Sequence, residues 1–185
     1  MMSQTRPDWL LGAERGAAAA ERIYAAAAEM LARDGIDALD IDALAARVHC
    51  SRATLYRHTG GKTQIRDAVL ARSAARIVET VRQAVTGLSG RARVLTAVEV
   101  AVGEVRTDPV ARLLVGAGGT TALVTSDTVT GFARDLAGLA DDDPEAANWI
   151  VRVVLSLLFW PATDLATERR MLERFLAPAF GREPS

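Results

Sequence analysis

No proline occurs between Pro7 and Pro109, more than half of the 185-residue chain, and this absence constrains the fold most strongly. Proline breaks helix interiors, so its absence leaves room for long helices. Ala, Leu, Arg and Glu dominate the composition, and all four are good helix formers. No segment shows the apolar–polar alternation of a half-buried strand. The sequence therefore predicts an all-α fold.

Apolar residues at spacings of three and four, bounded by capping residues and glycines, predict nine helices. The helices cover about residues 14–33, 41–48, 51–58, 62–85, 91–106, 109–115, 122–139, 144–160 and 166–177. Asp40 and Ser51 are the expected N-caps of the second and third helices. Gly35 suits the left-handed position after the first helix. The run Asp143-Pro144-Glu145 marks the start of the eighth helix, with a cap followed by proline and an acid.

The composition is ordinary for a soluble protein, with 24% charged residues. The single Cys50 excludes an internal disulfide, so nothing favours secretion. Residues 1–16 lack the long apolar core of a signal peptide. The most apolar run, residues 149–160, is too short to span a bilayer. We therefore expect a cytoplasmic protein without a membrane segment.

Charge is sorted along the chain. Residues 43–66, here called the basic segment, contain five Lys and Arg and no Asp or Glu, whereas the whole chain has a net charge of -1. Both histidines, His49 and His58, also lie in this segment. A short basic segment on a nearly neutral chain suits a protein that touches a polyanion with one face. Its Lys and Arg can displace counterions from phosphates.

The second and third predicted helices are short and joined by a tight turn, as in a helix-turn-helix, whose second helix enters the major groove. Leu55 is the apolar anchor of that helix and must face the core. Ala53 and Arg57 then lie on the opposite side. Arg57 can bond guanine edges with both of its terminal nitrogens, and Ala53 permits close approach or contact with a thymine methyl.

Other side chains around this helix suit the phosphate backbone. The hydroxyls of Thr54 and Tyr56 can bond phosphate oxygens, and Arg52 and His58 lie nearer the flanks of the helix. Lys62 begins the next helix, where its charge and the free amides can act on one phosphate. The predicted DNA-binding residues are Ser51, Arg52, Ala53, Thr54, Tyr56, Arg57, His58 and Lys62.

The segment from Leu44 onward, LAARVHCSRATLYRHTGGKTQI, resembles the helix-turn-helix signature of the TetR family of transcriptional repressors. The likeness covers roughly residues 14–72. It includes core, cap and phosphate-contact positions at fixed spacing: Leu44, Ala45, Ser51, Thr54, Leu55, Tyr56, His58 and Lys62.

The resemblance implies a nine-helix fold, with a three-helix DNA-binding head at residues 1–62 and a ligand-binding, dimerising body at residues 63–185. It also implies a homodimer through the last two helices, and the run from Ile150 to Phe159 is apolar all round, as a shared interface requires. The function implied is a ligand-responsive regulator, most simply a repressor released from a pseudo-palindromic operator by a small, mostly apolar effector.

Two positions depart from the family pattern. The family usually has glycine in the turn where this chain has His49, and a left-handed conformation there costs more for histidine. It also has an aromatic residue, usually Phe, where this chain has Thr59. That position lies one turn after Leu55 and faces the core, so we expect looser packing of the recognition helix.

Five residues of the body are candidates for ligand binding. Phe132, Trp149 and Trp160 either line a pocket or fill the core, and the sequence leaves both open. Glu99 is the odd polar residue in an enclosed helix. It either meets a ligand donor or pairs with an arginine such as Arg152, because buried charges are usually paired.

Two other functions are compatible with parts of the sequence. An all-α enzyme is disfavoured because both histidines and the only cysteine lie in the basic segment, which leaves the body none for acid–base, nucleophilic or metal chemistry. We therefore predict no enzymatic activity, no catalytic residue, no cofactor and no metal site. The alternative is an architectural DNA-binding protein without a ligand, which predicts weak sequence preference and a solid body.

Overall fold

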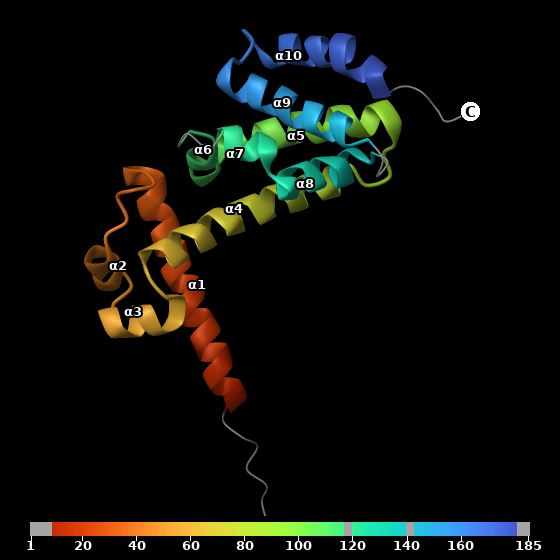
Figure 1. Ribbon diagram of the computed structural model, residues 1–185. Helices are drawn as coiled ribbons and strands as arrows, with labels where there is room; N and C mark the ends of the chain where they lie inside the picture. Colours follow the sequence, from red (N-terminus) through yellow and green to blue (C-terminus); the bar gives the residue numbers. More distant parts are fainter. Residues whose placement is uncertain (1–8, 117–119, 140–142, 181–185) are drawn as a thin grey trace, which may run out of the picture. The chain divides into compact units, whose positions relative to one another are not determined.

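The structure is a computed structural model that describes residues 9–116, 120–139 and 143–180, and the side chains of these residues except 9–15 and 120–122. The described residues are helical and contain no strand, so the all-α prediction is confirmed. The helices are α1 (Trp9–Asp34), α2 (Ile41–Arg47), α3 (Arg52–Thr59), α4 (Lys62–Ala84), α5 (Gly90–Thr107), α6 (Pro109–Gly116), α7 (Thr120–Thr125), α8 (Asp127–Ala137), α9 (Pro144–Phe159) and α10 (Leu165–Met171) (Figure 1).

Three helix ends follow the expected chemistry. The Asp40 carboxylate accepts hydrogen bonds from the amides of Asp42 and Ala43, at 2.7 and 2.9 Å, and so caps α2. Asp143 caps α9 by accepting from the Ala146 amide at 2.9 Å, with Pro144 as the first helical residue. Gly35 has φ +94° after the end of α1.

Helix α1 begins at Trp9 rather than near residue 14. The structure also differs from the nine predicted segments in two other places. The segment 122–139 is two helices, α7 and α8, because Ser126 has an extended backbone and its hydroxyl accepts from the Val129 amide at 3.4 Å. Serine is a preferred N-cap residue, but the regular apolar spacing on both sides of Ser126 predicted one continuous helix. The last helix leaves α geometry after Met171, continuing as a π turn over Leu172–Leu176 and a 3₁₀ turn over Ala177–Phe180.

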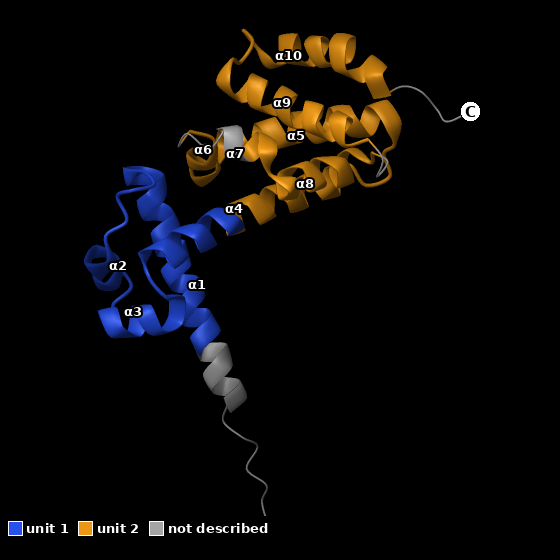
Figure 2. Cartoon of the chain, in the orientation of Figure 1, with its two compact units in different colours: residues 1–71 blue, residues 72–185 orange. Residues whose placement is uncertain are grey.

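The chain divides into two compact units, residues 1–71 and 72–185, with the division inside α4 (Figure 2). Our expected boundary lay at the start of that helix, at Lys62. In unit 1, α1, α2 and α3 pack on one another. The core of unit 1 also includes Ile65 and Val69 from the beginning of α4. One continuous helix therefore contributes residues to both units.

Unit 2 is organised around α5, which packs against α8, α9 and the terminal 3₁₀ turn (Figure 1). Val94, Val98 and Val102 lie one turn apart on α5 and belong to one buried cluster with residues of α8, α9 and the π turn. A second buried cluster joins Ala97 of the same helix to α4 and α8. No helix in the described part of the chain is both long and apolar enough to cross a membrane.

Arg93 holds the C-terminal end of α8. Its Nε donates to the Leu136 carbonyl and its Nη2 to the Asp135 carbonyl, each at 2.9 Å. Gly138 follows in the left-handed conformation, with φ +68°. A Cβ atom on Gly138 would lie 2.8 Å from Cδ and Nε of Arg93. Only glycine at this position therefore lets the Arg93 side chain keep its observed conformation.

Replacing Gly138 with alanine should destabilise the protein by about 1 to 2 kcal/mol, because a left-handed alanine is strained and Arg93 must move. Gly131 is the matched control, since it lies inside α8 and a Cβ there meets nothing within 4 Å. Gly131→Ala should stabilise the protein by up to ~1 kcal/mol through helix propensity. Urea unfolding measures both changes. Equal stability of the two variants would contradict the role given to Arg93.

Candidate nucleic-acid interface and effector cavity

The recognition helix α3 is fixed by its cap and by its anchor. Ser51 accepts from the Thr54 amide at 3.1 Å, and the hydroxyls of these two residues lie 2.9 Å apart. Leu55 is fully buried, as its role as anchor requires. His49, in the preceding turn, has φ +55° and is the one described non-glycine residue with a positive φ. The left-handed turn expected at this position is therefore present.

Thr59 occupies the core-facing position predicted for it and is only 7% exposed. Its hydroxyl donates to the Leu55 carbonyl, one turn earlier, at 2.8 Å. A buried hydroxyl without such a bond would be costly, and this bond satisfies it inside the helix. Thr59 therefore replaces an aromatic ring without leaving a buried polar group unpaired, although it fills less space.

The face of α3 opposite Leu55 is open to solvent. Ala53, Tyr56 and Arg57 are exposed, as the helical wheel predicts. His58 is only partly exposed, and its ring lies beside Gly16 of α1: a Cβ on that glycine would be 3.7 Å from Cε1 and Nδ1 of His58. His58 thus packs on α1, while the three exposed residues have room for DNA.

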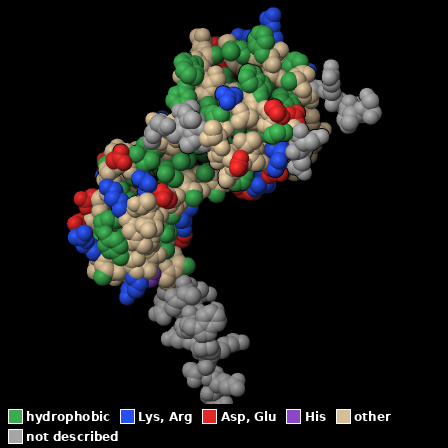
Figure 3. Space-filling model, in the orientation of Figure 1, with side chains coloured by type: hydrophobic (Ala, Val, Ile, Leu, Met, Phe, Trp, Pro, Cys, Tyr) green, Lys and Arg blue, Asp and Glu red, His purple; other side chains and the backbone are tan. Residues whose placement is uncertain are grey.

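The cations of the basic segment are less free than the sequence suggests. Four of them bond acidic residues or a carbonyl outside the segment: Arg47 with Glu29, Arg52 with Asp42 (3.2 Å), Lys62 with the Asp37 carbonyl (3.0 Å) and Arg66 with Asp67 (3.1 Å). Acidic and basic side chains are interspersed on the visible face of unit 1 (Figure 3). Arg57 is the remaining cation of the segment, and it has no hydrogen bond or ion pair with any other described residue.

Sequence reasoning missed these partners because the segment was defined by its lack of acids. Asp42 and Asp67 flank the segment directly, Asp37 lies in the turn before α2, and Glu29 belongs to α1. Hydrogen bonds from the amides of Ala43 and Asp42 hold the pKa of the Asp40 carboxyl below its usual value, with smaller help from Lys62 and Arg52. Asp40 therefore keeps its negative charge at the start of α2.

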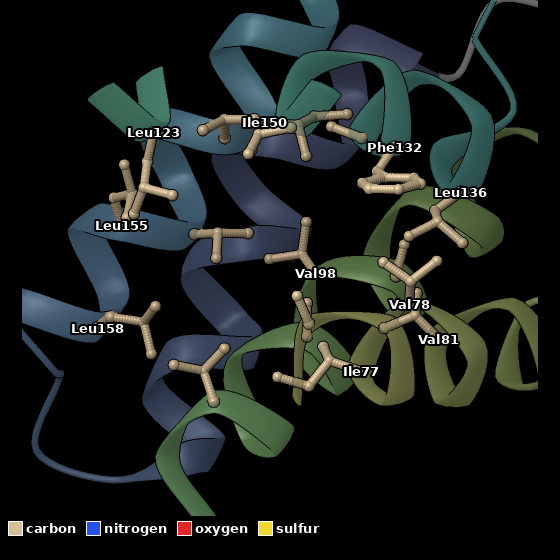
Figure 4. Close-up of a pocket in the computed structure, with 18 of the residues that line it drawn as sticks. Ile77, Val78, Val81, Val98, Leu123, Phe132, Leu136, Ile150, Leu155 and Leu158 are labelled. Carbon is tan, nitrogen blue, oxygen red and sulfur yellow. The ribbon is translucent and has the colours of Figure 1, made fainter. Parts of the chain in front are cut away.

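An apolar cavity of about 220 Å³ lies within unit 2 (Figure 4). Its wall, as far as the structure describes it, consists only of Ala, Val, Ile, Leu and Phe side chains. They come from α4 to α9, and include Ile77, Val78, Val81, Val98, Leu123, Phe132, Leu136, Ile150, Leu155 and Leu158. Such a space can bind an apolar molecule and offers no side-chain group for acid–base or metal chemistry.

The five residues predicted for ligand binding do not form one site. Phe132 lines the apolar cavity. Trp149 and Arg152 border a separate open hollow near the start of α9, and Trp149 is 53% exposed. Trp160 follows the end of α9 and is 76% exposed. Glu99 borders a third hollow, with Arg106, Glu168 and Arg169.

The phase of α9 explains this distribution. Helix α9 contributes residues 150, 151, 154, 155 and 158 to the wall of the apolar cavity, and these form one aliphatic stripe at helical spacing. Trp149, Arg152 and Phe159 lie off that stripe and are exposed. Sequence reasoning weighted aromatic residues, whereas the helix places its aliphatic residues toward the space.

Glu99 pairs with an arginine other than the expected one. Its Oε1 lies 3.8 Å from Nε of Arg169, while the Arg152 Nε donates to the Asn148 side chain at 2.7 Å. The neighbouring Arg106 and Glu168 form a two-point pair at 2.7 and 2.8 Å. No group of three or more His, Cys, Asp or Glu side chains in the described residues is arranged to hold a metal ion.

A buried carboxylate anchors the beginning of α6 to α4. Asp108 accepts from the Val110 amide at 2.9 Å, and its other oxygen accepts from the Ser73 hydroxyl and from Arg76. Burial alone would raise the pKa of Asp108. The bonds from Ser73 and Val110 and the charge of Arg76 outweigh it and lower that pKa. Helices α4 and α6 both contribute to the wall of the apolar cavity, so this network fixes two of its sides.

Comparison with solved structures shows the same fold. The TetR family repressor AlkX from Dietzia sp. strain DQ12-45-1b superposes with a TM-score of 0.56 and 19% identity, over 87% of this chain and 95% of that one. The transcriptional repressor QsdR of R. erythropolis gives a TM-score of 0.51 and 19% identity, over 90% and 96% of the two chains.

Sequence comparison shows the family. A family model described as bacterial regulatory proteins, tetR family, matches residues 23–69, which include α2 and α3. Two uncharacterized HTH-type transcriptional regulators of Mycobacterium tuberculosis, MT1294 and Rv1255c, are each 30% identical over 184 residues. Each alignment covers 92% of this chain and 89% of the relative. The chain therefore belongs to the tetR family of bacterial regulatory proteins and is a DNA-binding transcriptional regulator, not an enzyme.

Proposed function

We propose that this regulator is a repressor, and that it leaves a pseudo-palindromic operator when a small, mostly apolar effector occupies the cavity of unit 2. The observation that carries the proposal is the wall of that cavity, which is apolar throughout its described part. An architectural protein without a ligand should have a solid body, so the cavity disfavours that alternative. AlkX and QsdR are both named repressors, which supports repression rather than activation of transcription by this protein.

Helix α4 provides a physical connection between the cavity and the DNA-binding unit. Ile77, Val78 and Val81 belong to the cavity wall, and Ile65 and Val69 of the same helix belong to the core of unit 1. A ligand that prefers one position of α4 biases the unit that carries α3. The change in operator affinity can be only as large as that preference.

Regulators of this family act as dimers, and we propose that this one pairs through its last two helices. Of the large apolar side chains that are exposed in the described residues, most lie at this end of the chain: Trp149, Phe159, Trp160, Leu165, Met171 and Phe175. Exposed apolar side chains gathered at one end of the chain support an interface there. Two-fold symmetry then presents two copies of α3 to two half-sites. The expected place of action is the cytoplasm, where the operator lies.

Arg57 is the proposed reader of a base, because it is exposed and has no partner among the described residues. Once an operator has been selected from random duplexes, Arg57→Ala should cost roughly 1 to 3 kcal/mol and relax specificity at one base pair of each half-site. Fluorescence anisotropy on the operator and its single-base variants measures this. Uniform weakening on every sequence would instead assign Arg57 to a phosphate.

Benzene tests whether the cavity is coupled to DNA, because apolar cavities of about 150 Å³ bind it. Benzene should lower the affinity for the selected operator, and Ala101→Phe, which fills part of the cavity, should abolish the response. Ala75→Phe is the matched control on an exposed position of α4 and should respond like the parent. If benzene raises the melting temperature of the protein but leaves operator binding unchanged, the cavity binds ligands without regulating.

A further inference from the structure

The wall of the apolar cavity determines which molecules can enter it. Every side chain of its described part ends in hydrocarbon, and in helix interiors the backbone groups are already hydrogen-bonded to one another. A hydroxyl, amide or carboxylate carried into this space would lose its water and gain no partner. Binding is therefore selective against polar groups as well as favourable to apolar ones.

The size of the cavity narrows the choice. At about 220 Å³ it exceeds the roughly 150 Å³ that holds benzene and falls short of the ~300 Å³ at which pockets for drug-sized ligands begin. With roughly 30 Å³ for each group of the size of a water molecule, it holds about six to ten carbon atoms. Phe132 is the one aromatic side chain in the described wall, so stacking contributes little to recognition.

We propose that the effector is an aliphatic hydrocarbon of about six to ten carbon atoms, without a polar group that must enter the cavity. This assignment rests on the proposed function, because it names the ligand of the same cavity. Recognition then depends on volume and on exclusion of polar groups, with no hydrogen bond between protein and effector.

The test compares n-octane with 1,8-octanediol and octanoate, which have the same chain length. Melting temperature without DNA reports binding, and anisotropy of a labelled operator reports release. Octane should bind at least about tenfold more tightly than either polar probe. Equal or tighter binding of the diol or octanoate, or no binding of octane, would overturn the assignment. If octane binds and the operator stays bound, the ligand class stands and the regulatory proposal fails.

Two substitutions on α9 test the same cavity wall by changing the protein instead of the ligand. Val154 lines the cavity, and its neighbour Val153 does not. Val154→Thr replaces a methyl group with a hydroxyl group of nearly equal volume. It should therefore weaken octane binding several-fold and reduce the ratio of octane affinity to diol affinity. Val153→Thr should change neither quantity. Equal effects of the two variants would mean that octane binds outside this cavity.

A second inference concerns DNA and rests on the ion pairs of unit 1. Arg52 is the first residue of α3, and its Nε lies 3.2 Å from the Asp42 carboxylate, with both side chains exposed. Arg52 is one of the residues predicted to contact a phosphate, and that contact requires it to leave this carboxylate. We infer that Asp42 is a positioning residue that restrains the phosphate contact of Arg52. It lowers the part of the affinity that is independent of sequence.

Asp42→Asn should tighten binding about two- to five-fold on both random duplex and operator at low salt, with a smaller gain at high salt. The gain should disappear when Arg52→Gln is already present. Asp37→Asn is the matched control, because it removes the same charge nearby and, among the described residues, only the Asp37 carbonyl and not its carboxylate has a partner. A gain that persists without Arg52, or an equal gain from Asp37→Asn, would show general charge repulsion and overturn the inference.

Discussion

Val94, Val98 and Val102 succeed one another at intervals of one turn along α5, and each is almost completely removed from water. Their burial against α8, α9 and the terminal turns holds unit 2 together, since apolar area removed from water is the dominant favourable contribution to folding. Small β-branched side chains let helices approach closely, but they fill limited volume. Val98 is therefore both a core residue and part of the cavity wall. The helix that organises the unit also leaves the space that a ligand can fill.

Unfilled apolar space destabilises a protein, by about 24 cal/mol for each Å³ in a closed core. A regulator can exploit this cost, because a ligand that fills the space stabilises whichever arrangement of helices encloses it best. The Asp108 network joins α6 to α4 through Ser73 and Arg76, and both helices contribute to the wall. In the proposed mechanism, a ligand in the cavity acts on DNA binding through α4, the helix that contributes residues to both units.

The DNA-binding unit shows how far sequence reasoning reaches. Capping chemistry is local, so Asp40, Ser51 and Asp143 could be read directly, and the anchor Leu55 followed from helical spacing. Ion pairs depend on which helices pack together, so the pairing of Arg47 with Glu29 and of Arg52 with Asp42 was not predicted. A segment without acids in the sequence has acids around it in the fold.

The same distinction applies to unit 2. Its helices could be predicted from spacing, except where the hydroxyl of Ser126 begins a new helix inside an apolar stretch. The cavity could not, because a wall of ordinary aliphatic residues has the same sequence pattern as a filled core. A shift of one position along α9 separates Ile150 in the wall from Trp149 at the surface. Aromatic content therefore pointed to a residue outside the wall of the cavity.

The most direct test of the account is a closed thermodynamic cycle on one preparation of the protein. Calorimetry would measure the Kd for operator with and without saturating octane, and the Kd for octane with and without operator. Linkage requires the two ratios to be equal, and the account predicts that each ligand weakens the other by the same factor, about five-fold or more. Octane that binds the free and the operator-bound protein equally well would contradict control of DNA binding by this cavity.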